Sequence, residues 1–450
     1  MLERELSDQQ RIVTKHDDYY DGRQPLGFAS PKFREAFGAL FSAFAVNWCS
    51  IVVDAPTERL AVEGFRFGDD EKSDSEAWEI WQSNYLDADS SLLHSEAIKT
   101  GGGYLLVDPS PTTAGQEPRI TVEHPSQMIV RASGGDRRRR TAALKRWAEG
   151  DGTLRANVYL PEATYKFVAV DPNGEHSSRI ARALSWVVGG SGNGWRPLKG
   201  EEFVQNPLGV VPVVPMFNNP TMLRGGKSEL AEAEPIQDAI NKETADMLVS
   251  SEFQAFRQRV LMGVEIPRDP ETGQPVAGAD LKAMQSRLWV FENENAKIGE
   301  FTETPLSNYV DAIRSLRDDL AGITRTPPHY IVANIVNASG DALKAAEAGL
   351  VAKVMRKQTD FGESWEEAMR LAFLAKGDAE RGHAVRAHTI WRDPENRTRA
   401  ETVDAAIKLK GLGLPREVLW KLAGFAQQEI DRMKGLPVVQ MTSPPAEGEQ

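Results

Sequence analysis

The sequence predicts an α+β protein in which a mixed half is followed by a mainly helical half. Up to residue 220, short apolar and β-branched runs alternate with turn residues, the pattern of strands. From residue 228 onward, apolar residues recur three and four apart, the spacing of one helix face. A length of 450 residues, with 41% hydrophobic and 26% charged residues, is typical of globular chains with two or three modules.

Helices are expected first in the mixed half. Residues 1–20 are polar and helical in character, and residues 33–52 carry apolar side chains at helix-face spacing that Pro56 should end. Two further helices are expected at 75–85 and 91–100. The strands that follow are short and bounded by turn residues, at 104–107, 119–123, 127–131, 142–147, 154–160, 163–170 and 210–217.

The helical half begins with a long rod at 228–262, about 50 Å long, interrupted only by Pro235, where a kink or a delayed start is expected. Prolines and glycines then break the helix over 263–303, with a short strand at 287–291. Thr304 and Pro305 are a strong helix start, and this second helix should run to residue 323.

Two prolines, Pro327 and Pro328, forbid continuation of that helix and open an uncharged connector. Ser339 can cap the helix expected next, at 341–376. A strand at 383–391 and short helices at 394–410, 415–423 and 426–434 follow, before a tail from residue 437 that is expected to be disordered.

Composition excludes several classes. A net charge of −12 argues against tight non-specific wrapping of nucleic acid, which needs clustered Lys and Arg. Cys49 is the only cysteine, so no intrachain disulfide can form and a reducing cytoplasm fits. The N-terminal residues lack the apolar core of a signal peptide. The sequence has no run of about 18 apolar residues, so no membrane span is expected.

Glycine motifs point to backbone geometry more than to nucleotides. Residues 224–228, read as RGGKS, resemble the end of a phosphate-binding loop, but Thr221 stands where its first glycine belongs. We therefore interpret the pair before the long helix as a hinge. The glycine triplet at 101–103 precedes a strand, whereas the glycines of a dinucleotide site follow a strand and open a helix. We therefore interpret it as a plain turn.

Candidate polar clusters favour structural explanations. The four arginines from Arg137 to Arg140 lie between strands, so a solvated hairpin tip is expected, with contact to phosphate or an acidic neighbour as the alternative. His383 and His388, five apart in one expected strand, are a poor metal pair. Cys49 is expected in the core, and the pairs 366–367 and 318–319 on solvated surface. No catalytic residue, metal or cofactor is predicted, which argues against an enzyme.

Several motifs occur in an order that resembles a known family. They are 47–54 with 58–60 and 64–65, then NPLG at 206–209 with 211–215, 228–241, SGDALK at 339–344, and WRDP at 391–394 with 400–401 and 408–409. In this order, and with a helix–excursion–helix–loop–helix plan, the chain resembles the portal proteins of long-tailed bacteriophages over roughly residues 10–435.

The resemblance implies a portal-type architecture with a mixed α/β wing, a long-helix stem, a small α/β clip and a helical C-terminal crown. The implied parts are a wing at 1–226, a first stem helix at 227–262, the clip at 263–303, and a second stem helix at 304–323. A tunnel loop at 324–339, a long wing helix with its return strand at 340–392, a crown at 393–435 and a disordered tail at 436–450 complete the chain.

The family also implies a function. By this resemblance the chain would form a structural ring of identical subunits, usually twelve, at one capsid vertex. Double-stranded DNA would be packaged and ejected through the ring. The implied partners are the large terminase, a head–tail adaptor, and the major capsid and scaffolding proteins, in a virion assembled in the host cytoplasm, with no membrane. Another head component, such as a minor capsid or adaptor protein, is the alternative, and a packaging enzyme ranks after it.

Candidate site residues follow from this analogy. The tunnel loop presents Pro327, Pro328, His329, Tyr330, Asn334 and Asn337. Stem residues that would form basic rings near phosphates, or else intersubunit ion pairs, are Lys242, Arg257 and Arg259. Apolar stem residues expected to pack between subunits are Ile236, Ile240, Met247, Phe253, Phe256, Val310, Ile313, Leu316 and Leu320.

Overall fold

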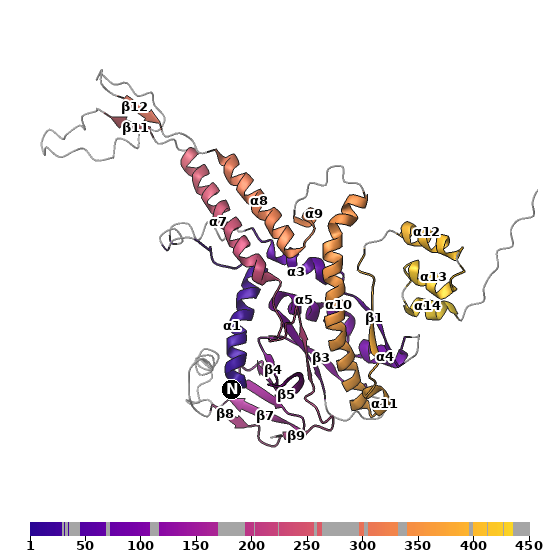
Figure 1. Ribbon diagram of the computed structural model, residues 1–450. Helices are drawn as coiled ribbons and strands as arrows, with labels where there is room; N and C mark the ends of the chain where they lie inside the picture. Colours follow the sequence, from indigo (N-terminus) through magenta and orange to yellow (C-terminus); the bar gives the residue numbers. More distant parts are fainter. Residues whose placement is uncertain are drawn as a thin grey trace, which may run out of the picture. The chain divides into compact units, whose positions relative to one another are not determined.

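The computed structural model describes most of the chain (Figure 1). The described residues are 1–28, 31, 35, 46–68, 73–108, 117–169, 194–201, 203–223, 225–255, 259–262, 297–300, 305–331, 340–395, 399–411, 413–425 and 427–434. They divide into two compact units. The first comprises residues 1–25, 46–237 and 319–450, and the second residues 26–45 and 238–318.

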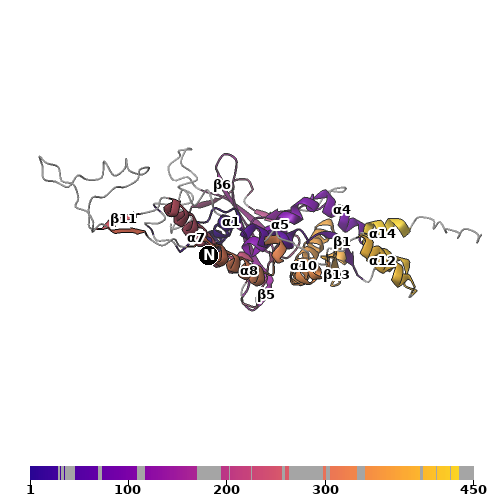
Figure 2. The ribbon, with the colours of Figure 1, turned by 90° about the horizontal axis from the view of Figure 1, so that it is seen from above.

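The first unit is a mixed α+β body. Its helices are α1 (Leu2–Tyr20), α3 (Cys49–Thr57), α4 (Ser75–Ser83), α5 (Leu86–Thr100), α9 (Pro328–Ile331), α10 (Gly340–Lys376), α11 (Ala379–Gly382), α12 (Arg399–Lys410), α13 (Arg416–Leu422) and α14 (Gln427–Lys434). Figure 2 shows α12 and α14 close together at the C-terminal end of the ribbon, with α13 packed against both.

Strands of the first unit form three antiparallel sheets. The strands are β1 (Val62–Phe67), β2 (Gly102–Val107), β3 (Ile120–Glu123), β4 (Met128–Ser133), β5 (Asp136–Ala148), β6 (Leu154–Tyr159), β7 (Ala163–Ala169), β8 (Trp195–Pro197), β9 (Phe203–Gln205), β10 (Val213–Phe217) and β13 (Ala387–Trp391). Their orders are β10-β2-β3, β4-β5-β6-β7-β8 with β9 also on β7, and β1-β13.

Alternation along the strands places a core on each face of the large sheet. Leu144 and Ala156 point to one face, where they pack with Leu6 of α1. Ala143 and Tyr159, paired on the same two strands, point to the other face and pack with Val213 of the β10-β2-β3 sheet. Because successive side chains of a strand face opposite ways, one sheet therefore supports two layers.

The C-terminal half of α10 supplies an aromatic core. Trp365 is fully buried, with its ring 4.8 Å from that of Trp81, and its Nε1 donates to Nε2 of His94 over 2.9 Å. Burial lowers the pKa of His94 to about 3, which keeps its ring neutral. Phe373, also buried, stacks edge-on against Phe67. Regularly spaced large apolar residues thus fix this helix against α4, α5 and β1.

Two long helices pass between the units. These are α7 (Leu230–Ala255) and α8 (Leu306–Thr324), and the unit boundary falls after Gln237 in α7 and before Asp319 in α8. Between them in sequence lie β11 (Arg259–Met262) and β12 (Lys297–Glu300), which pair antiparallel with each other. Among the described helices, none is long and apolar enough to cross a membrane.

Several element predictions are confirmed. The helices expected at 1–20, 305–323 and 341–376 appear as α1, α8 and α10, and the three C-terminal helices appear as α12 to α14. Six of the seven expected strands appear as β2 to β7, and the seventh, expected at 210–217, begins three residues late as β10. The strand expected at 287–291 and the tail lie outside the described residues, as does most of the helix expected at 33–52, of which the last residues belong to α3.

Other predictions were wrong. The helix expected at 228–262 ends at Ala255, because residues 259–262 pair residue by residue with the distant strand 297–300. Its length is therefore about 39 Å and not 50 Å. Pro56 lies inside the last turn of α3, which continues to Thr57. The helix ends one residue after the proline, so the N–H that Pro56 lacks costs a single bond of the last turn.

Two polar clusters are also placed differently. The hairpin turn falls at residues 134–135, so the arginines belong to β5, and Arg140 forms an ion pair with Glu367 at 2.5 Å. That acidic neighbour matches the alternative interpretation for one of the four. Glu366 is buried instead of solvated, accepts from the Thr389 backbone N–H over 2.9 Å, and has its pKa raised by burial. His383 follows α11, outside the strand that holds His388.

Candidate functional site

The segment after α8 is shaped by backbone hydrogen bonds and proline. Arg325 adopts a left-handed conformation, with φ of 54°, directly after the last residue of the helix. The Thr326 N–H then reaches back to the Ala321 carbonyl over 3.0 Å, which closes the helix end. Pro328 occupies the first position of α9, where a missing N–H costs nothing. The expected tunnel loop thus opens with a helical turn.

Arg59 fastens this turn to three other segments. Its guanidinium donates to the Tyr330 hydroxyl over 2.8 Å and to the Pro394 carbonyl over 3.1 Å, and lies 3.2 Å from the Glu347 carboxylate. Burial disfavours the charge, but Tyr330 and Glu347 together raise the pKa of Arg59 above its usual value. A single buried cation therefore joins the turn after α3 to α9, α10 and the segment that leads to α12.

His329 adds a second contact to the same carboxylate. Its Nε2 lies 3.5 Å from Oε1 of Glu347, and its ring stands edge-on to Tyr330 at 4.8 Å. Pro327 is buried, whereas Pro328 is exposed. The side chains of His329 and Tyr330 are therefore held by their own chain, by partners, Glu347 and Arg59, that no sequence pattern indicates. Asn334 and Asn337 lie outside the described residues.

The basic residues predicted for the stem do not form one row. Lys242 on α7 forms an ion pair with Asp246 one turn along the same helix. Arg259 lies on β11, opposite Glu300 of β12, so its placement on a stem helix was wrong. Arg257 lies outside the described residues. Within one chain, the Lys242 contact is a third possibility beside phosphate rings and intersubunit pairs.

The apolar stem residues differ in burial. Ile240 and Leu320 are fully buried within one chain, so their side chains have no surface left for a neighbouring subunit. Ile236, Met247, Ile313 and Leu316 are half-buried, and Val310 is 44% exposed. Phe253 lies on α7, whereas Phe256 falls outside the described residues. The subunit-packing prediction therefore rests on the half-buried and exposed members.

The glycines predicted as a hinge are instead a tightly packed crossing. A Cβ on Gly226 would lie 1.5 Å from the Gly101 carbonyl oxygen, so only glycine lets the two backbones approach. Beside it, the Ser228 hydroxyl accepts from the Leu230 N–H over 2.9 Å and caps α7. Lys227 forms an ion pair with Glu232 at 2.5 Å. The motif therefore lets the chain pass close to Gly101 and then begin α7.

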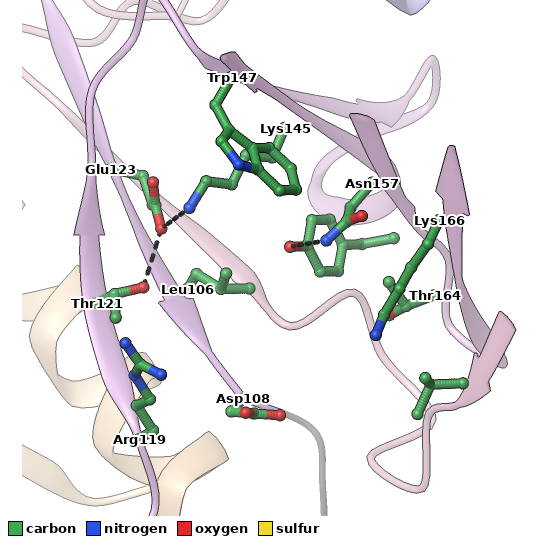
Figure 3. A pocket seen from close by; sticks show the side chains of 12 residues that line it. Leu106, Asp108, Arg119, Thr121, Glu123, Lys145, Trp147, Asn157, Thr164 and Lys166 are labelled. Carbon is green, nitrogen blue, oxygen red and sulfur yellow. Dashed lines mark hydrogen bonds and ion pairs between the residues drawn. The ribbon is translucent and has the colours of Figure 1, made fainter. Parts of the chain in front are cut away.

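A pocket of about 330 Å³ opens between the sheets (Figure 3). Glu123 accepts from Lys145 over 2.6 Å and from the Thr121 hydroxyl over 2.9 Å, so its charge is neutralised. In the same wall, the buried Thr164 hydroxyl has no hydrogen-bond partner among the described residues. Polar walls and this volume suit ordered water. The lining comes from β2, β3, β5, β6, β7 and β9, with Asp108 and Arg119 at their ends.

Three potential metal ligands meet near α1. Atoms of Asp17, Glu96 and His124 lie within 4.8 Å of one another. However, Lys99 Nζ lies 2.7 Å from Asp17 and 2.8 Å from Glu96, in the position that a cation would take. Burial opposes ionisation of Glu96, but His124 and Lys99 outweigh it and lower the Glu96 pKa. The lysine thus already pairs with both carboxylates.

Comparison with known proteins defines the class to which this arrangement of long helices and mixed α+β body belongs. The chain belongs to the family of phage portal proteins, SPP1 Gp6-like, whose model matches residues 5–435. It is 33% identical to the portal protein of Mycobacterium phage D29 and 32% identical to that of Mycobacterium phage L5. These alignments cover 95% of this chain in both cases and 86% and 85% of the relatives.

Family membership confirms the resemblance and favours a portal over the minor capsid or adaptor alternative. Among solved structures, a chain from the virion of a native gene transfer agent particle aligns with a TM-score of 0.40. Its sequence is 10% identical, and the alignment covers 92% of this chain and 99% of that chain.

Proposed function

We propose that this chain is the subunit of a ring at one vertex of a phage head, through which double-stranded DNA enters and leaves. The observation that carries the proposal is the family match across residues 5–435, supported by two relatives named as portal proteins. The fold is compatible with it, since two long helices flank a separate paired-strand segment. In this role the protein is a conduit of the virion and performs no catalysis.

The parts are assigned by analogy with small changes of boundary. The body around the sheets is the wing, α7 and α8 are the stem, and the segment with β11 and β12 is the clip. The first stem helix then ends at Ala255, so Arg259 belongs to the clip side. The helices α12 to α14 are the crown. A net charge of −12 suits a channel that lets DNA slide without a strong grip.

The partners follow from the same role. The subunits would form a twelve-membered ring, assembled in the host cytoplasm and kept in the virion. The large terminase would dock on the clip during packaging, and a head–tail adaptor would dock there afterwards. Major capsid and scaffolding proteins would contact the wing and crown. Exposed and half-buried stem residues, such as Val310 and Ile313, are the surfaces offered to neighbouring subunits.

The connector at 327–338 is the proposed channel constriction, with α9 as its base. The contacts of Tyr330 and His329 with Arg59 and Glu347 would hold this base in place. Replacing residues 332–338 by an equal number of Gly and Ser residues, with α9 intact, should leave rings intact and reduce DNA packaging. Packaging equal to that of the wild type would remove this assignment. A matched Gly/Ser replacement in the 171–193 segment controls for loss of folding.

Native mass spectrometry with negative-stain images tests the proposal as a whole. A ring of about a dozen subunits with a central hole is expected for the purified full chain. A monomer or dimer that persists at high concentration, with or without scaffolding protein, would overturn it.

A further inference from the structure

A buried group of charges lies where α7 begins and α8 ends. Glu229, just before the first residue of α7, has its two carboxylate oxygens 2.8 Å from Lys353 Nζ and 2.6 Å from Lys357 Nζ. Both lysines belong to α10, one turn apart. Lys353 also donates to the carbonyl of Thr324, the last residue of α8, over 2.8 Å. Lys357 also donates to the Asn218 side chain.

The charges in this group are unusual for a protein interior. The side chains of Lys353, Lys357 and Glu229 are only 9%, 2% and 10% exposed. Two cations share one carboxylate, so the group carries an excess positive charge. Removing ammonium groups from water is costly, and apolar residues would pack here at lower cost. Unlike apolar residues, the lysines fix particular groups by hydrogen bonds: the Thr324 carbonyl, the Asn218 side chain and the Glu229 carboxylate.

These hydrogen bonds hold the ends of α7 and α8 that belong to the first unit. Only the first eight residues of α7 and the last six of α8 belong to the first unit, since the boundaries fall after Gln237 and before Asp319. The lysines hold both of these ends on α10. The same helix begins at Gly340, just after the proposed constriction, and carries Glu347 of the Arg59 cluster.

We propose that Lys353 and Lys357 are positioning residues that couple the ends of α7 and α8 to α10, and through α10 to α9. Lys353 provides the link to α8 and Lys357 the link to the residue 218 turn, while Glu229 ties both to α7. In a portal, a displacement of either stem helix would thereby reach the constriction segment. This last role rests on the proposed function, whereas the coupling itself is a property of the folded chain.

Hydrogen–deuterium exchange on the full chain tests the coupling. Lys353→Met should speed amide exchange at residues 319–326 by about tenfold, and Lys357→Met should do so at residues 216–219 and 230–237. Both should also speed exchange in α9 and in residues 340–348, at the start of α10. Arg356→Met is the matched control, because it removes one positive charge from the same helix at an exposed position.

The pattern of exchange decides the outcome. Faster exchange confined to residues 350–360, or equal changes in the Arg356→Met control, would overturn the proposal and leave the lysines a merely local role. If Lys357→Met fails to fold, as judged by circular dichroism, the less buried Lys353→Met still makes the test at the end of α8. Exchange is measured whatever the oligomeric state, so a missing ring would count against the proposed function alone.

Discussion

The two halves of α10 differ although they form one continuous helix. In the first half, small residues predominate and most positions at 342–349 are exposed. In the second half, Phe361, Trp365 and Phe373 are fully buried against the sheets and α5. In the first half, Glu347 contacts Arg59 and His329, whereas the second half is held by a core. Lys353 and Lys357 lie between the exposed first half of α10 and its buried second half.

This contrast shows how a long helix can be both anchored and accessible. Alanine favours helix without needing burial, so the first half remains helical while exposed. Large apolar residues three and four apart make the second half depend on its neighbours. Substitutions along α10 and at its partner Glu229 should therefore have graded effects.

The largest effect is expected in the buried half. Trp365→Ala should cost about 4 kcal/mol in the free energy of unfolding, because it opens a cavity and leaves the His94 nitrogen without its donor. Urea unfolding of the full chain measures the loss. Met355→Ala, at a position 48% exposed on the same helix, should change stability by less than about 0.5 kcal/mol. Similar losses in the two variants would break the comparison.

At the junction between the halves, Glu229→Gln should cost about 3 kcal/mol, because it leaves two buried lysines without their carboxylate. The triple variant Glu229→Gln, Lys353→Met, Lys357→Met should recover most of that loss, since no unpaired buried charge remains. Urea midpoints of both variants test this. A triple variant less stable than Glu229→Gln would show that the charges stabilise the fold outright.

Stability should also depend on pH through Lys357. Burial lowers its pKa to about 8, and Glu229 offsets this only in part. A base with a depressed pKa in the folded state binds fewer protons there than in the unfolded chain. Stability should therefore rise by about 2 kcal/mol between pH 7 and pH 10. The rise should be absent in Lys357→Met, and an identical pH profile in that variant would refute its cause.

Glu229 titrates at the other end of the pH scale. Burial would raise its pKa, but the charges of Lys353 and Lys357 and their hydrogen bonds outweigh this and hold it at about 2. Its contribution is therefore present above about pH 4.5 and lost as the pH falls towards 2. Acid unfolding of the wild type should show this loss, and the triple variant should not.

The smallest effect is expected in the exposed half. Ala345→Gly should destabilise the helix locally by about 1 kcal/mol, because glycine is a poor helix former and no packing compensates. Amide exchange at residues 340–348 should quicken, with little change in global unfolding. Ala345→Leu should leave the isolated chain unaltered. A global loss of stability in either variant would show that this half is more firmly packed than its exposure indicates.

Regular periodicity made part of the fold predictable. The apolar spacing of α8 and of the second half of α10, and the turn residues around β2 to β7, each reflect local structure. Long-range pairing was not predictable in the same way. β11 resembles a helix continuation until its partner at 297–300 is known, and β1 pairs with β13 from the other end of the chain.

The site was predicted less well than the fold, for a related reason. Sequence order placed Pro327 to Tyr330 after a helix, but the partner of Tyr330 is Arg59 and that of His329 is Glu347. Lys353 and Lys357 lie three or four residues from Leu350, Val354 and Phe361, on the apolar face of α10, but no local signal shows that Glu229, from a distant segment, pairs with them. Glu366 was likewise expected on the solvated surface and is buried. Contacts between distant segments decide these cases.

The single cysteine, described above as part of the core, has a practical consequence. Cys49 is fully buried, and no other thiol exists in the chain. Maleimide reagents should therefore leave the native protein almost unlabelled. A cysteine introduced at Met222, where the side chain is 91% exposed, would become the sole reactive site. The protein thus offers a silent background for fluorescence and spin-label distances, which can report on neighbouring copies without a cysteine-free variant.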